Sequence, residues 1–165
     1  MAEIIKKQDT RRVFVETLNE LAENDPNIVV IICDVGFNYL DDPKNKFKVL
    51  NLGVTEQSAM IIAAGLALSG LKPYFYSMIN FALFRPGEMV RNAVVKHNAN
   101  VKIIGVKGSD KYKFLGFSHN LLHNEEDINF CKNIGLESYI IETNKDVKDI
   151  ILETYKKNSP CYIRL

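Results

Sequence analysis

The sequence has no excess of charge of either sign. Its 21 Lys and Arg residues are balanced by 20 Asp and Glu residues, so the formal net charge is +1. Such a balance offers no broad basic field for nucleic acid. Long apolar runs are missing too, since no stretch approaches the roughly 20 residues of a membrane-spanning helix, and MAEIIKKQDTRR (residues 1–12) lacks a signal-peptide pattern. We therefore expect a cytoplasmic protein without nucleic-acid or membrane partners.

Cysteine is scarce. Cys33, Cys131 and Cys161 form no C-x-x-C pair, are odd in number and lie in apolar surroundings. This pattern favours reduced structural thiols over disulfides or zinc ligands. His119 and His123 are four residues apart, but the pair lacks the Glu and the third ligand of a zinc protease helix. We expect no metal site on these residues.

Several motifs of other enzyme classes are also missing. No G-x-G-x-x-G follows an expected strand, and GVKGSD (residues 105–110) does not satisfy the phosphate-loop pattern. There is no G-x-S-x-G nucleophile motif, which weakens the alternative of an unrelated α/β enzyme that uses His119 as a base. Nucleotide binding has no support.

What is present fits one globular domain. The 165 residues are 47% hydrophobic and 25% charged, enough to bury a real core. Short branched or aromatic apolar runs alternate with patterns of helical period. The expected strands cover residues 28–33, 47–52, 74–78, 101–106, 137–142 and 160–164. The expected helices cover residues 9–24, 55–70, 86–97, 124–133 and 145–157. This alternation predicts an α/β fold with an open, mostly parallel sheet and helices on both faces.

Ligands of such sheets gather at the carboxyl ends of the strands. Asp34, Glu56, Phe81 and the segment 107–123 each follow an expected strand, so all four should lie at that edge. The segment 107–123 has no clear periodicity, and connections of that length are usually functional or mobile.

The stretch NLGVTEQSAMIIAAGLALSG (residues 51–70) joins a strand end to a helix that opens on Glu56. Thr55 suits the helix cap. Ala63, Ala64, Gly65 and Ala67 would let another backbone approach closely, at a packed helix face or a subunit contact. An acid in a first helical turn is also common for a simpler reason, because the helix dipole stabilises it.

The same stretch resembles the pyrimidine-binding domain of transketolase-type thiamine diphosphate enzymes. Their signature places a Gly-x-x-Glu-Gln turn before an Ala/Gly-rich helix, and Gly53, Glu56 and Gln57 match it. The resemblance continues through SMINFALFRPGEMVRN (residues 77–92) and GFSHNLLHNEEDI (residues 116–128), in the expected order. It implies that residues 1–165 form a single pyrimidine-binding domain.

The resemblance also implies roles for side chains. Glu56 would hydrogen-bond the aminopyrimidine ring of the coenzyme and so activate its thiazolium carbon. Phe81 would stack on the pyrimidine, in a Phe-Ala-x-x-Arg motif that ends at Arg85. Phe84 and Asp34 complete the expected cofactor-binding set, although core packing alone is a sufficient reason for two Phe residues near a strand end.

His119 lies in Gly-Phe-Ser-His, which resembles the Ser/Thr-His of transketolases, where this His contacts the substrate and transfers protons. Glu56 and His119 are therefore the catalytic candidates. One departure concerns the substrate pocket, because GSDKYKF (residues 108–114) stands where the family usually has Gly-x-Asp-Gly.

No Gly-Asp-Gly metal-ligand motif of a diphosphate-binding domain occurs in the chain. The resemblance therefore implies a separate subunit that binds the diphosphate and Mg²⁺, in a heterotetramer of two copies of each. The expected substrate is a ketose or 2-oxo acid, with two-carbon transfer as the leading reaction and unusual sugar biosynthesis as a suitable role. A decarboxylase or carboligase subunit and a non-catalytic assembly subunit remain alternatives.

Overall fold

The computed structural model describes residues 9–108 and 110–165. Residues 1–8, part of the segment without a signal-peptide pattern, and Ser109 in the segment 107–123 lie outside this description. Six parallel strands form one open sheet in the order β2-β1-β3-β4-β6-β5. The strands are β1 (Ile28–Ile32), β2 (Lys48–Asn51), β3 (Lys72–Met78), β4 (Lys102–Val106), β5 (Glu137–Ile140) and β6 (Cys161–Arg164). The expected α/β sheet with helices on both faces is confirmed, and among the described residues every strand pair is parallel.

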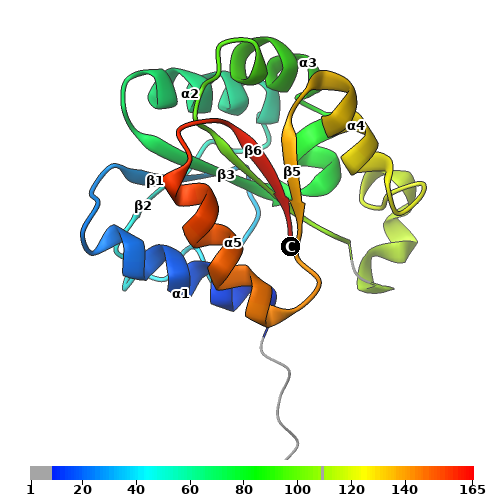
Figure 1. Cartoon of the computed structure of the whole chain (residues 1–165). Coiled ribbons are helices and arrows are strands. Elements are labelled where there is room, and N and C mark those ends of the chain that lie inside the picture. Colours follow the sequence, from blue (N-terminus) through cyan, green and yellow to red (C-terminus); the bar gives the residue numbers. More distant parts are fainter. Residues whose placement is uncertain (1–8, 109) are drawn as a thin grey trace, which may run out of the picture.

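Helices cover both faces of the sheet (Figure 1). Helices α1 and α5 pack on one face, while α2, the segment from η1 to η2 and α4 pack on the other. The helical elements are α1 (Thr10–Ala22), α2 (Glu56–Leu68), η1 (Asn80–Phe84), α3 (Gly87–Met89), η2 (Val90–Val95), η3 (Asp110–Ser118), α4 (Glu126–Ile134) and α5 (Asn144–Lys156).

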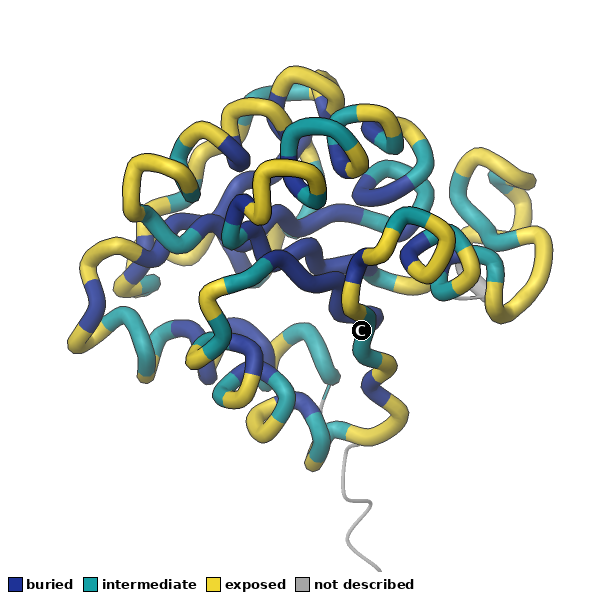
Figure 2. The backbone as a smooth tube through the Cα atoms, turned by 45° about the horizontal axis from the view of Figure 1, so that its top comes forward, coloured by how far each residue is buried: buried dark blue, intermediate teal, exposed yellow. Residues whose placement is uncertain are grey.

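The central strands are buried on both sides, as Figure 2 shows. All five residues of β1 are buried, which explains why its sequence is continuously apolar rather than alternating. Phe14 and Leu18 of α1 fill the core on one face, and Met60 and Ala63 of α2 fill it on the other. The sheet therefore holds the strand ends, and the loops that follow them, in fixed relative positions.

Two helical segments differ from the sequence prediction. The helix expected at 86–97 is preceded by η1, a π-helical turn in which the N–H of Arg85 donates to the carbonyl of Asn80 at 2.9 Å. Phe81 thus lies in a helical turn directly after β3. The segment 107–123, whose sequence has no clear periodicity, contains the 3₁₀ segment η3, which is kinked at Gly116 with a φ of 65°. Periodicity of 3.6 residues detects neither π nor 3₁₀ geometry.

The amino ends of the strands are tied by a polar cluster. Asp25 accepts hydrogen bonds from Lys72 Nζ at 2.6 Å and from Tyr155 Oη at 2.8 Å, and it also accepts from the N–H of Asn27. These contacts join the α1–β1 turn to β3 and to α5. The cluster lies at the edge of the sheet opposite the carboxyl ends.

In the part of the chain that the structure describes, no helix has both the length and the apolar character needed to cross a lipid bilayer. The three cysteines are free thiols and all are buried.

Candidate functional site

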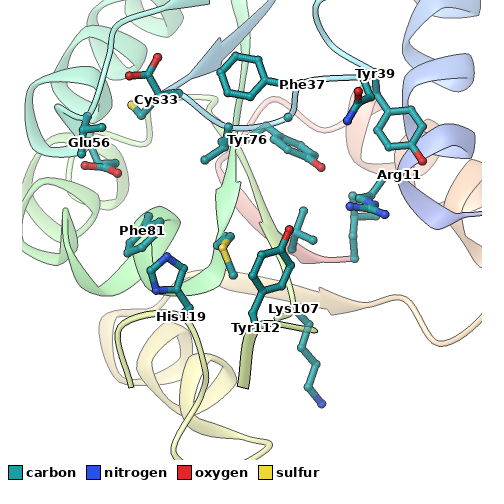
Figure 3. A pocket seen from close by; sticks show the side chains of 18 of the residues that line it. Arg11, Cys33, Phe37, Tyr39, Glu56, Tyr76, Phe81, Lys107, Tyr112 and His119 are labelled. Atoms are coloured by element: carbon teal, nitrogen blue, oxygen red, sulfur yellow. The ribbon is translucent and has the colours of Figure 1, made fainter. Parts of the chain in front are cut away.

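A cavity of about 740 Å³ opens at the carboxyl ends of the strands. Its walls come from the first turn of α1, the loop after β1, the start of α2, η1 and η3. Figure 3 shows Glu56, Phe81 and His119 at one end of the cavity, and Arg11 and Tyr39 at the other. Asp34, Glu56, Phe81 and His119, which the sequence places at one edge, all line it.

Glu56 is the buried acid of the cavity. It is the first residue of α2 and is only 2% exposed. Its Oε1 accepts a hydrogen bond from Arg85 Nη1 at 2.7 Å, and the two form an ion pair. Thr55 occupies the cap position, but its hydroxyl donates to the carbonyl of Leu52 instead of capping the helix. The helix dipole and Arg85 therefore compensate the charge of a carboxylate that water hardly reaches.

Phe81 lies between Arg85 and His119. The guanidinium carbon of Arg85 is 4.0 Å from the centroid of the Phe81 ring, a cation–π contact. The His119 ring meets the Phe81 ring edge-on, with centroids 4.9 Å apart and an interplanar angle of 83°. The residues thus form a contact chain from Glu56 through Arg85 and Phe81 to His119, along one wall of the cavity.

Ser118 is a hydrogen-bond partner of the histidine ring. Its Oγ lies 2.7 Å from His119 Nδ1 and also within reach of the carbonyl of Leu115 at 3.0 Å. A serine hydroxyl has one proton, so when that proton goes to Leu115, Nδ1 of His119 is the donor to Oγ. Nε2 then carries the lone pair and is free to accept a proton.

Two of the expected cofactor-binding residues, Phe84 and Asp34, lie apart from the contact chain of Glu56, Arg85, Phe81 and His119. Phe84 is not among the residues that line the cavity. Its ring packs edge-on against Phe130 of α4, with centroids 5.6 Å apart. Asp34 does line the cavity, but it is exposed and has a left-handed backbone with a φ of 51°. It exchanges hydrogen bonds with Asn51, from the Asp34 N–H to Oδ1 at 3.1 Å and from Asn51 Nδ2 to Oδ1 of Asp34 at 2.9 Å.

The far end of the cavity contains residues that the sequence did not single out. Arg11 pairs with Asp9 through several hydrogen bonds, and Tyr39 Oη also donates to Asp9 at 3.0 Å. The hydrogen bonds from Arg11 hold the pKa of the Asp9 carboxyl at about 2, below its ordinary value of 3.8. Tyr112 and Lys107 line the cavity from the opposite side. This end can therefore offer cationic and phenolic hydrogen-bond donors to a polar ligand.

Cys33 and Tyr76 line the floor of the cavity. Burial raises the pKa of the Cys33 thiol to about 11, and burial likewise raises the pKa of Tyr76. Both groups are therefore neutral at physiological pH. Among residues 9–108 and 110–165, no group of three or more His, Cys, Asp or Glu side chains is placed to hold a metal ion.

Comparisons with known proteins identify the family of the chain. The family described as "Transketolase, pyrimidine binding domain" matches residues 6–165. The chain is 35% identical over 163 residues to an apulose-4-phosphate transketolase subunit of Phocaeicola vulgatus, covering 94% of this chain and 50% of that protein. It is 26% identical over 162 residues to the 6-deoxy-6-sulfo-D-fructose transketolase subunit SqwH of Clostridium sp., covering 94% of this chain and 48% of that protein.

The fold comparison gives the same family. A solved structure described as "Split gene transketolase, inactive beta4 tetramer" superposes with a TM-score of 0.80 at 26% identity, covering 96% of this chain and 51% of that one. The chain thus spans about half the length of these three proteins. A match over residues 6–165, together with the parallel sheet and the acid at the start of α2, places the chain in the transketolase pyrimidine-binding domain family.

Proposed function

We propose that this chain is the pyrimidine-binding subunit of a split, thiamine diphosphate-dependent transketolase-like enzyme, with residues 1–165 acting as a single domain. The observation that carries the proposal is the position of Glu56. This carboxylate is 2% exposed, opens helix α2 and lies at a cavity that also contains the Phe81 ring. A buried acid beside an aromatic ring suits a flat nitrogen heterocycle better than it suits a phosphate or a metal ion.

The donor set fits the aminopyrimidine half of the coenzyme. Glu56 would hydrogen-bond a ring nitrogen, and the low dielectric of its surroundings would strengthen that bond. Phe81 would cover one face of the aminopyrimidine ring, while the guanidinium of Arg85 compensates the negative charge of Glu56. When bound, thiamine diphosphate supplies a thiazolium carbon that acts as the nucleophile toward a carbonyl substrate.

His119 would serve the substrate. Its ring lies against Phe81 and lines the same cavity, so it is placed to take or give a proton at a substrate hydroxyl or carbonyl oxygen. Arg11 and Tyr112 would donate to polar groups at the far end of the cavity, where the Tyr39 hydroxyl, whose proton goes to Asp9, can accept. A ketose or 2-oxo acid, with transfer of a two-carbon unit, suits this combination of a proton-transfer residue and polar donors.

A partner subunit would bind the diphosphate and Mg²⁺. The described residues hold no group of three or more metal-ligand side chains, and a relative at 35% identity is described as a subunit of a transketolase. Helix α2 exposes apolar side chains that would be buried by such a partner: Ile61 is 51% exposed, Ile62 42% and Leu68 62%. At Gly65 on the same helix, an added Cβ would meet no atom within 4 Å. We propose a heterotetramer of two copies of each subunit.

The test is reconstitution with a diphosphate-binding subunit. Calorimetry of thiamine diphosphate binding and assays of two-carbon transfer are compared for the native chain, Glu56→Ala and His119→Ala. We expect both variants to assemble, Glu56→Ala to lose turnover, and His119→Ala to keep coenzyme binding with reduced turnover. An assembled complex whose activity does not change with Glu56→Ala would contradict the proposal and favour a non-catalytic assembly role.

A further inference from the structure

The loop that carries His119 (residues 107–123) accepts two hydrogen bonds from Asn80, a side chain to which no role has been given above. Asn80 is the first residue of η1 and immediately precedes Phe81. Its Nδ2 donates to the carbonyl of Phe117 at 2.9 Å and to the carbonyl of Asn120 at 3.3 Å. These two carbonyls lie on either side of Ser118 and His119 in the chain. One carboxamide therefore joins the end of β3 to both flanks of the histidine.

A second carboxamide, that of Asn120, forms hydrogen bonds within the loop. Asn120 Nδ2 donates to the carbonyls of Tyr112 at 2.9 Å and Gly116 at 2.8 Å. The backbone at Gly108 approaches the loop so closely that an added Cβ would lie 2.6 Å from the carbonyl oxygen of His119. The segment from Tyr112 to Asn120 is thus held together by its own hydrogen bonds. Asn80 connects this unit by further hydrogen bonds to η1, which carries Phe81.

Among the neighbouring apolar side chains, Leu121 packs against the core cluster that contains Ala82 and Leu83, whereas the two phenylalanines of the unit do not anchor it. Phe114 and Phe117 are 81% and 78% exposed, so their rings contribute little burial on this chain. The contacts between the loop and η1 include the two Asn80 hydrogen bonds and the edge-on contact of His119 with Phe81. Because Asn80 and Phe81 are consecutive residues of η1, the position of this backbone determines both where the Phe81 ring lies and where the His119 loop is attached.

We propose that Asn80 is a positioning residue that fixes His119 against Phe81. It acts on backbone carbonyls, so it determines where the imidazole lies without touching a reactant. The inference deepens the proposed function, because the geometry it maintains is that between the coenzyme end of the cavity and the proton-transfer residue. A displacement of about 1 Å in such a geometry costs on the order of a hundredfold in rate.

The structural test uses the 165-residue chain and needs no turnover. The three histidines are assigned by NMR, and the cross-peak between the rings of Phe81 and His119 is measured in the native chain, Asn80→Asp and Asn80→Ala. Asn80→Asp replaces the donor with an oxygen that faces two carbonyls, and Asn80→Ala removes the group. We expect the cross-peak to lose more than half its intensity in both variants, while the signals of His97 stay unchanged.

Asn100→Asp is the matched control. Asn100 is also half-buried and donates through Nδ2 to one oxygen, Oδ1 of Asn158 at 3.2 Å, but it lies at the opposite edge of the sheet. It should leave the His119 signals unchanged. If Asn80→Asp does not fold, Asn80→Ala decides, and an unchanged cross-peak in a folded Asn80→Ala chain overturns the inference.

The functional test uses the complex with the diphosphate-binding subunit. We expect Asn80→Ala to lower kcat by about tenfold to a hundredfold, with coenzyme affinity changed less than about twofold because Glu56 and Phe81 remain. A native complex without turnover would overturn the proposed function and leave the NMR result intact. A lost cross-peak with unchanged kcat would overturn the positioning role alone.

Discussion

Arg85 Nη1 lies 2.7 Å from Glu56 Oε1, and the pair joins a partly exposed guanidinium to a carboxylate that is 2% exposed. The same guanidinium covers the Phe81 ring at 4.0 Å. One side chain thus compensates the buried charge and packs on the aromatic wall of the cavity. We therefore expect mutations of Glu56 and of Phe81 to have coupled effects.

Removing the cation alone should destabilise the chain. Arg85→Met leaves the Glu56 carboxylate buried without its partner, and we expect the free energy of unfolding to fall by about 2 kcal/mol. Adding Glu56→Gln to the same chain should recover most of that loss, because a neutral amide has no charge to compensate. Urea unfolding of the two single variants and the double variant gives the coupling. If the changes in the free energy of unfolding were additive, the cost of losing Arg85 would not come from the charge of Glu56.

Phe81 and Phe84 should separate ligand binding from packing. Phe81→Leu keeps an apolar side chain but loses the aromatic face, worth about 0.5 to 1.5 kcal/mol, so coenzyme affinity in the reconstituted complex should fall by roughly twofold to tenfold. Phe84→Leu should leave that affinity unchanged and cost about 1 kcal/mol of stability, because its ring packs on Phe130. Calorimetry and thermal unfolding measure the two effects. A larger affinity loss for Phe84→Leu would restore Phe84 as a cofactor contact.

The Asp25 cluster should make stability depend on acid pH. Burial acts to raise the pKa of Asp25, but hydrogen bonds from Lys72, Tyr155 and the Asn27 N–H outweigh it and hold the pKa at about 2, below the ordinary 3.8. Because the folded-state pKa is lowered, this stabilisation of about 2 kcal/mol is complete above about pH 4 and is lost as the pH falls toward 2.

Asp25→Asn tests this dependence. It should be less stable than the native chain at pH 7, and the difference should narrow between pH 4 and pH 2 in denaturant titrations. Asp149→Asn, at an exposed position of α5, is the control and should show no comparable change. A stability gap that stays constant from pH 7 to pH 2 would be inconsistent with the ion pair as the source.

Gly105 of β4 should not accept a side chain. An added Cβ would lie 2.5 Å from Tyr162 Oη, and that hydroxyl donates to the buried carboxylate of Asp127 at 2.7 Å. We expect Gly105→Ala to cost about 3 kcal/mol through overpacking and loss of that hydrogen bond. Gly65→Ala, in an open position of α2, should instead stabilise the chain by about 0.5 to 1 kcal/mol. Thermal unfolding of both variants is the measurement, and equal melting temperatures would argue against the close contact.

The sheet and one end of the cavity could be predicted from the sequence. The six apolar runs correspond to the six strands because each is short, branched and bounded by turn residues, and the acid after the second run does open helix α2. The start of the helix after β3 could not be placed, because the π-helical turn has no signature in apolar spacing. That turn also separates Phe81 from Phe84, since it leaves Phe81 beside Arg85 and turns Phe84 toward α4.

The far end of the cavity was missed for a different reason. Arg11 lies in the first turn of α1, which precedes the first strand, so it does not follow a strand end in the chain. A helix that runs antiparallel to its following strand nevertheless begins at the carboxyl edge of the sheet. That rule would have added Arg11 from sequence alone. Tyr76 lies within β3 and only the lateral packing of strands shows that its side chain faces the cavity.

The burial of all three cysteines has a practical consequence for physical studies of the chain. A thiol introduced by Asn24→Cys, exposed in the turn before β1, would be the accessible target for a maleimide dye. This turn lies at the rim of the sheet away from the cavity, so the dye would not obstruct coenzyme or substrate. Energy transfer from such a dye to a labelled diphosphate-binding subunit would test in real time whether the two chains associate as proposed.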